Sequence, residues 1–164
     1  MNSSTTPATL SQLAEALALN PLLGGLRPEF RQMIAGCAVV SEFEKGERLL
    51  SIGEPCDYFW LIRDGRVDVE IHGAPFGTLT IGRLERGEIL GLSWIATPFT
   101  AEFDATAVES GTAIQVDAAC LRAECGSHHE LGRVVYQSFA TLIRDRLHAT
   151  RIQLLDLYER QYGN

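Results

Sequence analysis

Hydrophobic and polar residues alternate with a period of two through the middle of the chain. The clearest example is RVDVEIH at residues 66–72, where every second residue is apolar. Short β-rich segments recur from residue 37 to 116, each ended by glycine, proline or aspartate: AVVSEF, RLLSI, YFWLI, RVDVEIH, TLTIGRL, DATAV and TAIQV. About seven or eight short strands with such turns are typical of an antiparallel sandwich or barrel of the jelly-roll class.

Two short helices are predicted before the strands. Residues 11–18 place leucines at 13 and 17 among good helix formers, and residues 28–35 begin with Pro28, which suits a first helical position. Residues 1–9 are polar and poor in hydrophobic residues, so we expect a flexible N-terminus there. The main domain is therefore expected to span residues 10–126.

The pattern after Val116 is helical again. DAACLRAEC fits one helix that can end at Gly126, and the sequence SHHE from Ser127 has the form of a capping box that opens another. Residues 130–162 contain no proline, and Gly132 is their only glycine. Residues 127–164 are thus predicted to form one long C-terminal helix of about 45–50 Å.

One face of this long helix carries a heptad seam. Its residues follow alternating steps of four and three: Tyr136, Ala140, Ile143, Leu147, Thr150, Leu154 and Leu157. A helix that lies along its own domain would explain the first half, where Val135, Phe139 and Leu142 widen the apolar face. It would leave Leu154 and Leu157 uncovered, so we expect the seam to form a homodimer.

Composition and charge argue against two classes of partner. Hydrophobic content of 46% and charged content of 21% are ordinary for a globular protein, and the net charge of −7 does not suit a nucleic-acid-binding surface. The arginines at 144, 146 and 151 are interpreted as a solvated helix face. No targeting segment and no apolar run of membrane-spanning length is present, so we expect a cytoplasmic protein with no membrane partner.

Four cysteines are present at positions 37, 56, 120 and 125. In a cytoplasmic protein we expect reduced thiols and no disulfide framework. Cys120 and Cys125, with the histidines at 128 and 129, superficially offer four metal ligands. The two cysteines lie five positions apart on a predicted helix, about 500° around its axis, and therefore on different faces. We expect no metal site.

Several short motifs resemble the cyclic nucleotide-binding domain of the catabolite activator and Fnr superfamily over residues 20–160. They are FEKGE at 43–47, GEP at 53–55, YFWLI at 58–62 before DGRV, and GEILGLSWIA at 87–96. The resemblance implies a mainly β fold with helices: an eight-stranded antiparallel β roll flanked by N-terminal helices and a long C-terminal helix. It also implies a regulatory and non-enzymatic role.

The stretch from Gly87 falls where this family carries its phosphate-binding cassette. There the resemblance implies a glutamate for the ribose 2′-hydroxyl and an arginine for the cyclic phosphate, followed by a serine or threonine. Leu92, Ala101 and Glu102 occupy those three places, and no Arg or Lys occurs between Gly87 and Leu121. High-affinity cyclic nucleotide binding is not expected. The candidate ligand-binding residues are the cassette positions and backbone amides of Gly91, Leu92, Ser93, Ala101 and Glu102.

Other chemistries fit the sequence less well. A cupin-type metal site needs paired histidines, and only His72 lies in the strand region. Haem ligation by His72 or a cysteine is an open alternative in this superfamily. No nucleophile–base arrangement is readable, so neither an enzyme nor a cofactor is expected.

Two functional hypotheses follow. The first is a sensor of a small ligand other than cyclic AMP or cyclic GMP, or one that binds those nucleotides only weakly. The second is a ligand-free module for dimerisation or protein docking. DNA-binding members of the superfamily continue into a helix-turn-helix, whereas this sequence ends at Asn164. We expect a free-standing sensor domain or a truncated chain, with no DNA reader.

Overall fold

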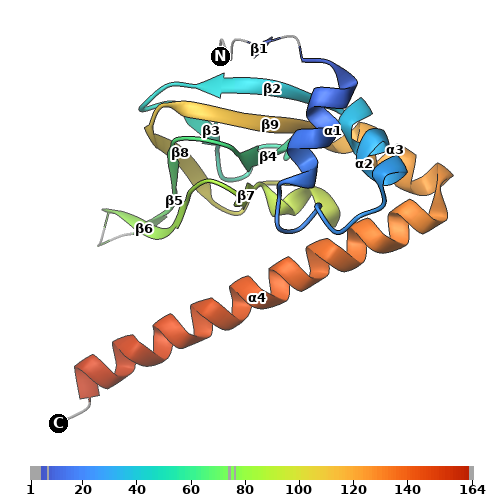
Figure 1. Ribbon diagram of the computed structural model, residues 1–164. Helices are drawn as coiled ribbons and strands as arrows, with labels where there is room; N and C mark the ends of the chain where they lie inside the picture. Colours follow the sequence, from blue (N-terminus) through green and yellow to red (C-terminus); the bar gives the residue numbers. More distant parts are fainter. Residues whose placement is uncertain (1–4, 7, 74, 76, 163–164) are drawn as a thin grey trace.

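Two antiparallel sheets face one another, with short helices at one end and a long helix beneath (Figure 1). This computed structural model describes residues 5–6, 8–73, 75 and 77–162. One sheet has the order β1-β2-β9-β4-β7 and the other β3-β8-β5-β6. The strands are β1 (Thr5–Thr6), β2 (Ala38–Phe43), β3 (Arg48–Leu50), β4 (Tyr58–Ile62), β5 (Arg66–Gly73), β6 (Gly77–Leu84), β7 (Ile89–Leu90), β8 (Asp104–Glu109) and β9 (Gly111–Asp117).

Strands β2 to β9 form the predicted eight-stranded roll. The alternation of apolar and polar residues in the sequence reflects which side chains point into it. In β5, Val67 is fully buried and lies opposite Leu84 of β6, while the next residue, Asp68, lies opposite Arg83. Successive side chains of a strand point to opposite faces of the sheet, so Val67 packs inside the roll while Asp68, only 5% exposed, pairs with Arg83 on the other face. The expected fold class is confirmed.

The two N-terminal helices lie close to the expected positions. Helix α1 (Leu10–Ala18) begins at a capping box between Thr9 and Gln12, and α2 (Pro28–Gly36) begins at its proline. Of the expected flexible start, residues 1–4 and 7 lie outside the described residues. Within it, Thr5–Thr6 pair with β2, and Thr9 caps α1.

Two helices follow β9, and a 3₁₀ turn interrupts the roll. They are α3 (Ala118–Ser127), α4 (His129–Tyr162) and η1 (Leu92–Ile95). The predicted capping box at Ser127 is wrong, because that residue is the last of α3 and α4 begins only at His129. None of the described helices combines the length and the apolar character that crossing a membrane requires.

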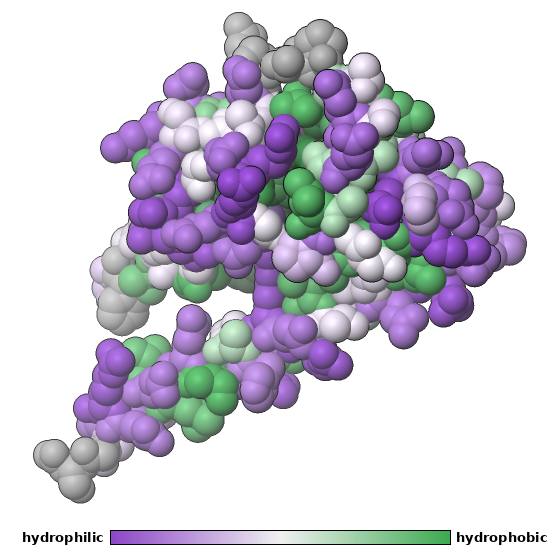
Figure 2. Space-filling model, viewed as in Figure 1, coloured by the Kyte–Doolittle hydropathy of each residue, from purple (hydrophilic) through white to green (hydrophobic). Residues whose placement is uncertain are grey.

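Helix α4 is buried along its first turns and exposed along the rest. Leu131, Val135 and Phe139 are fully buried against the helical end of the roll. The later seam residues Ile143, Leu147, Leu154 and Leu157 are 39–60% exposed. Figure 2 shows apolar side chains on the part of α4 that extends past the roll, with an open gap between the two.

The expectation of four reduced thiols is wrong, because Cys37 and Cys120 form a disulfide with their Cα atoms 5.6 Å apart. Strand pairing explains how residues so distant in sequence meet. Ala38 of β2 lies opposite Val116 of β9, so the residue before β2 lies beside the segment after β9. No group of three or more potential metal ligands occurs within the described ranges.

Candidate functional site

The cassette segment runs from β7 through η1 to β8. Gly91 lies between β7 and η1 with a φ of 89°, a left-handed conformation that favours glycine. A Cβ atom at this position would approach the Tyr58 carbonyl oxygen to 3.0 Å. The chain therefore needs a glycine to turn from β7 into η1 so close to β4.

The Cys56 thiol lies at the start of η1. It is 1% exposed, and its Sγ is 3.4 Å from the carbonyl oxygen of Tyr58 and 3.6 Å from that of Gly91. Burial raises the pKa of this thiol, and hydrogen bonds from the backbone N–H groups of Trp94 and Ser93 oppose that rise. A protein sulfur atom thus lies beside Gly91, the first of the positions where the sequence suggested ligand contacts.

The five predicted ligand-binding residues fall into two places. Gly91, Leu92 and Ser93 lie together at the start of η1, where Leu92 packs against the hydrophobic core. Ala101 is only 5% exposed, and its backbone exchanges hydrogen bonds with Gly53 and Glu54 across the roll.

Glu102, which follows Ala101, is exposed. The structure therefore brings positions 91–93 together and places positions 101–102 at the far end of the cassette segment.

Trp94 joins the cassette to α4. Its side chain is fully buried, stacks on Phe59 at 5.1 Å and Tyr136 at 6.1 Å, and meets the edge of Phe139 at 5.0 Å. The indole Nε1 has no hydrogen-bond partner among the described residues. Tyr136 is the first residue of the predicted seam, so a displacement of the cassette would press directly on that face of α4.

Two arginines reach the cassette from helices outside it. Sequence reasoning missed Arg122, and its interpretation of Arg146 as part of a solvated helix face is wrong. Arg122 of α3 donates from Nη1 to the Trp94 carbonyl oxygen at 2.8 Å, and its guanidinium lies 4.2 Å from the centre of the Phe99 ring. Phe99 itself has a φ of 58°, which is rare outside glycine. The contact spans 28 residues of sequence, and no local pattern signals it.

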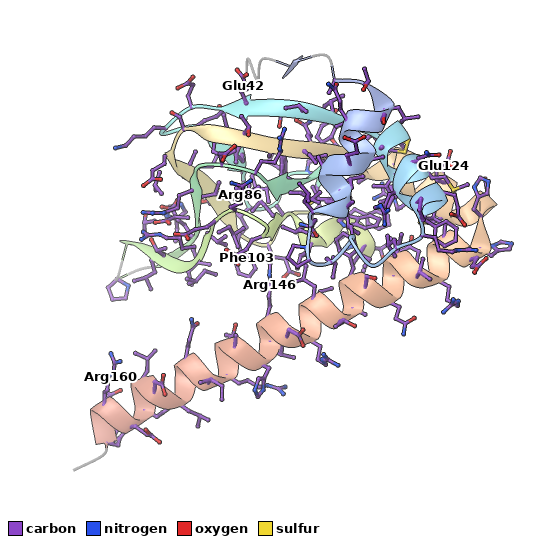
Figure 3. All side chains as sticks on the ribbon, viewed as in Figure 1. Glu42, Arg86, Phe103, Glu124, Arg146 and Arg160 are labelled. Atoms are coloured by element: carbon purple, nitrogen blue, oxygen red, sulfur yellow. A yellow bond between two sulfur atoms is a disulfide. The ribbon has the colours of Figure 1, made fainter. Side chains whose placement is uncertain are left out.

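Arg146 of α4 extends from the helix toward the roll in Figure 3 and donates to the Ile89 carbonyl oxygen. Burial lowers the pKa of this guanidinium, and the charge of Glu88 opposes the effect. Both Arg122 and Arg146 are therefore bonded to backbone carbonyls of the cassette segment.

The acidic residue at the end of the cassette has its own hydrogen-bond donors. Asp104 is 4% exposed and accepts from the backbone N–H of Ile52 at 2.8 Å, from Arg48 at 2.8 Å and from His72 Nε2 at 2.6 Å. These contacts hold the pKa of Asp104 below its usual range, the Ile52 hydrogen bond first. Its charge is compensated locally and adds little repulsion for an anion elsewhere in the roll.

Both ring nitrogens of His72 are engaged. Nε2 contacts Asp104, and Nδ1 lies 2.8 Å from the Thr78 hydroxyl. An axial haem ligand needs one nitrogen free for iron. The geometry therefore does not suit the haem alternative at this residue.

The fold and cassette position define a class of protein. The Cyclic nucleotide-binding domain family matches the chain at residues 40–128, which include the whole cassette segment. The chain belongs to this family. A comparison with curated proteins finds no match.

Solved structures of the family share the fold. A cyclic nucleotide-binding domain from Methylobacillus flagellatus is 20% identical, with a TM-score of 0.77 over 90% of this chain and 83% of that one. The Thermus thermophilus catabolite activator protein is 20% identical, with a TM-score of 0.69 over 84% of this chain and 63% of that one. The regulatory domain of Toxoplasma gondii protein kinase A, crystallised with cyclic AMP, is 15% identical, with a TM-score of 0.68 over 85% of this chain and 50% of that one.

Proposed function

We propose that this chain is a non-enzymatic regulatory module that senses a small ligand other than cyclic AMP or cyclic GMP, or binds those nucleotides only weakly. The observation that carries the proposal is the cassette itself. It keeps the family's glycine-bounded turn, while residues 87–121 supply no cation and the buried Cys56 thiol lies against the Tyr58 and Gly91 carbonyl oxygens at the start of η1.

The missing arginine has a definable cost. A charge-assisted contact with phosphate contributes about 1.5–3 kcal/mol, so its loss lowers affinity roughly tenfold to a hundredfold. Arg122 and Arg146 could replace it only by giving up their bonds to the carbonyls of Trp94 and Ile89. Such an exchange of one hydrogen-bond partner for another adds little binding free energy. A neutral or weakly anionic ligand therefore suits this roll better than a cyclic phosphate.

The output in this proposal is the geometry of α4. Trp94 stacks on Tyr136 and meets Phe139 edge to face, so a ligand that shifts η1 would shift the first turns of α4. The exposed seam beyond residue 143 then carries that shift to a second copy of the chain through a helix–helix dimer.

A second candidate is a ligand-free dimerisation or docking module of the same fold. One observation favours it: the interior of the roll is filled by its own side chains, among them Trp60, Leu84 and Leu90.

Native mass spectrometry of the chain purified from its own cells separates the two candidates. The sensor hypothesis predicts a dimer that carries a bound small molecule, released on denaturation and identifiable by its mass. A dimer at the bare protein mass would favour the docking module. A monomer at tens of micromolar would contradict the output mechanism that both candidates share.

A further inference from the structure

We propose that the Cys37–Cys120 disulfide is a thiol switch: a dithiol reductant opens it, and the opening loosens both the cassette and the start of α4. This inference goes beyond the proposed ligand role, since it needs no ligand. The disulfide lies at a junction, because Cys37 is the C-cap of α2 and Cys120 lies in the first turn of α3.

The two cysteine residues differ in exposure. Cys37 is 8% exposed, whereas Cys120 is half-buried. A reductant thiolate therefore attacks Cys120 Sγ, forms a mixed disulfide there and releases Cys37 as a thiolate that takes up a proton. The second thiol of the reductant then displaces Cys120, so two electrons and two protons reach the protein and the reductant leaves as a disulfide.

Backbone hydrogen bonds hold the junction once the disulfide is open. The Asp117 N–H donates to the Cys37 carbonyl oxygen at 2.8 Å, and the Asp117 side chain caps the Cys120 N–H at 2.7 Å. The pairing of β2 with β9 is also independent of the sulfur atoms. Reduction therefore removes the covalent link between α2 and α3, while these hydrogen bonds and the β2–β9 pairing keep the roll folded, as a reversible switch requires.

Helix α3 connects this junction to the functional site. Arg122 follows Cys120 by two residues, and it bonds the Trp94 carbonyl oxygen and covers the Phe99 ring. At its other end α3 packs tightly on α4, where a Cβ atom on Gly132 would come within 2.8 Å of the Cys125 carbonyl oxygen. Movement of α3 is thus transmitted to the cassette through Arg122 and to α4 through Gly132.

Thiol counting tests the disulfide itself. The chain is purified in air without reductant, denatured, and alkylated with a maleimide that adds a known mass. We expect two labels, at the free cysteines 56 and 125, and four after treatment with dithiothreitol. Four labels before reduction would overturn the proposal. Cys125→Ser is the matched control, and it should lose one label in both states.

Hydrogen–deuterium exchange tests the switch. We expect reduction, or Cys37→Ser, to speed exchange about tenfold in α3, in residues 94–101 and at the start of α4, while β5 and β6 stay unchanged. Cys120→Ser provides an independent copy of the reduced state should Cys37→Ser fold poorly. Equal exchange rates in the oxidised and reduced proteins would show that the disulfide has only a structural role and would overturn the proposal.

Arg122→Gln tests the proposed route to the cassette. In this variant reduction should still speed exchange in α3 but no longer in residues 94–101. A cassette response that persists in Arg122→Gln would contradict transmission through this side chain.

Discussion

Asp104 opens β8 with a carboxylate that is buried under three donors. One is the backbone N–H of Ile52, and the others are the side chains of Arg48 and His72. Hydrogen bonds to a buried charged group contribute more than those between neutral groups. This single side chain therefore ties the segment after β3 and the end of β5 to the strand that leaves the cassette.

Replacing Asp104 by Asn should destabilise the fold in a pH-dependent way. The folded pKa of Asp104 lies below its ordinary value of 3.8, so its stabilisation is complete above that pH and is lost as the pH falls through the folded pKa. We expect Asp104→Asn to lower the free energy of unfolding by about 2 kcal/mol at pH 7. The difference from wild type should shrink below about pH 3.8.

Urea denaturation at a series of pH values measures this difference. Asp145→Asn removes an exposed carboxylate on α4 that contacts its neighbour Arg144, so it serves as the control. The control should change the free energy of unfolding by less than about 0.5 kcal/mol. A deficit for Asp104→Asn that stays constant from pH 7 to pH 3 would contradict the assignment.

At the scale of elements, the junction of α3 and α4 depends on one glycine. Gly132 lies in the first turn of α4, and a side chain there would collide with the Cys125 carbonyl oxygen at 2.8 Å and approach the Cys125 Cβ at 3.4 Å. The atom in the way is a backbone oxygen, which cannot move aside as the end of a flexible side chain can. The close approach therefore sets the angle at which α4 leaves the domain.

Gly132→Ala and Gly126→Ala form a matched pair that tests this packing. Both residues are helical, but a Cβ on Gly126 would meet nothing within 4 Å. We expect Gly132→Ala to destabilise the fold by about 1–3 kcal/mol through overpacking and Gly126→Ala to stabilise it by about 0.5–1 kcal/mol. Thermal denaturation gives both values. Equal changes in stability for the two variants would show that the junction of α3 and α4 can accommodate a methyl group at Gly132.

Periodicity along the sequence was enough to predict the elements that repeat a pattern. Alternation revealed the longer roll strands. The absence of proline from residues 130–162, together with the heptad spacing, revealed α4, whose seam residues are exposed in the structure. The two-residue strand β7 is too short to show a period, and it was missed. The capping box at Ser127 failed because α3 continues through that residue.

The contacts of the cassette could not be predicted for a different reason. Three side chains contact it from other parts of the fold: Cys56 from the loop before β4, Arg122 from α3 and Arg146 from α4. Each lies 28 to 57 residues along the chain from the cassette residue that it contacts. The Cys37–Cys120 disulfide spans 83 residues. Such pairs depend on how sheets and helices pack, and no local pattern of residue types records them.

At the scale of the whole molecule, α4 extends well past the domain that it leaves. It has 34 residues, about 50 Å of helix, and its last buried residue is Phe139. Beyond that point the seam residues Leu147, Leu154 and Leu157 are about half exposed. An exposed apolar stripe with heptad spacing suits a partner helix of the same kind.

Leu154→Glu tests the seam where the roll does not reach. In a parallel dimer the change places two carboxylates opposite each other in an apolar layer. Lost burial costs about 2 kcal/mol per side chain, and the unpaired charges add to it. We expect light scattering to give a folded monomer of 18.0 kDa for the variant and twice that mass for the parent.

Ala149→Glu is the control for added charge, because Ala149 is exposed on α4 and lies off the seam. It should remain a dimer. A monomeric parent at tens of micromolar, or dissociation of both variants alike, would show that the stripe is not the interface.

Titration calorimetry with cyclic AMP and cyclic GMP tests the central claim, that this cassette has the family's turn without its phosphate site. The account predicts no binding tighter than about 100 µM for either nucleotide, a standard free energy of about −5.5 kcal/mol. Ala101→Arg, which restores a cation at the place implied by the family resemblance, should tighten binding if the pocket is otherwise intact. Sub-micromolar affinity of the unaltered chain for either nucleotide would contradict the account.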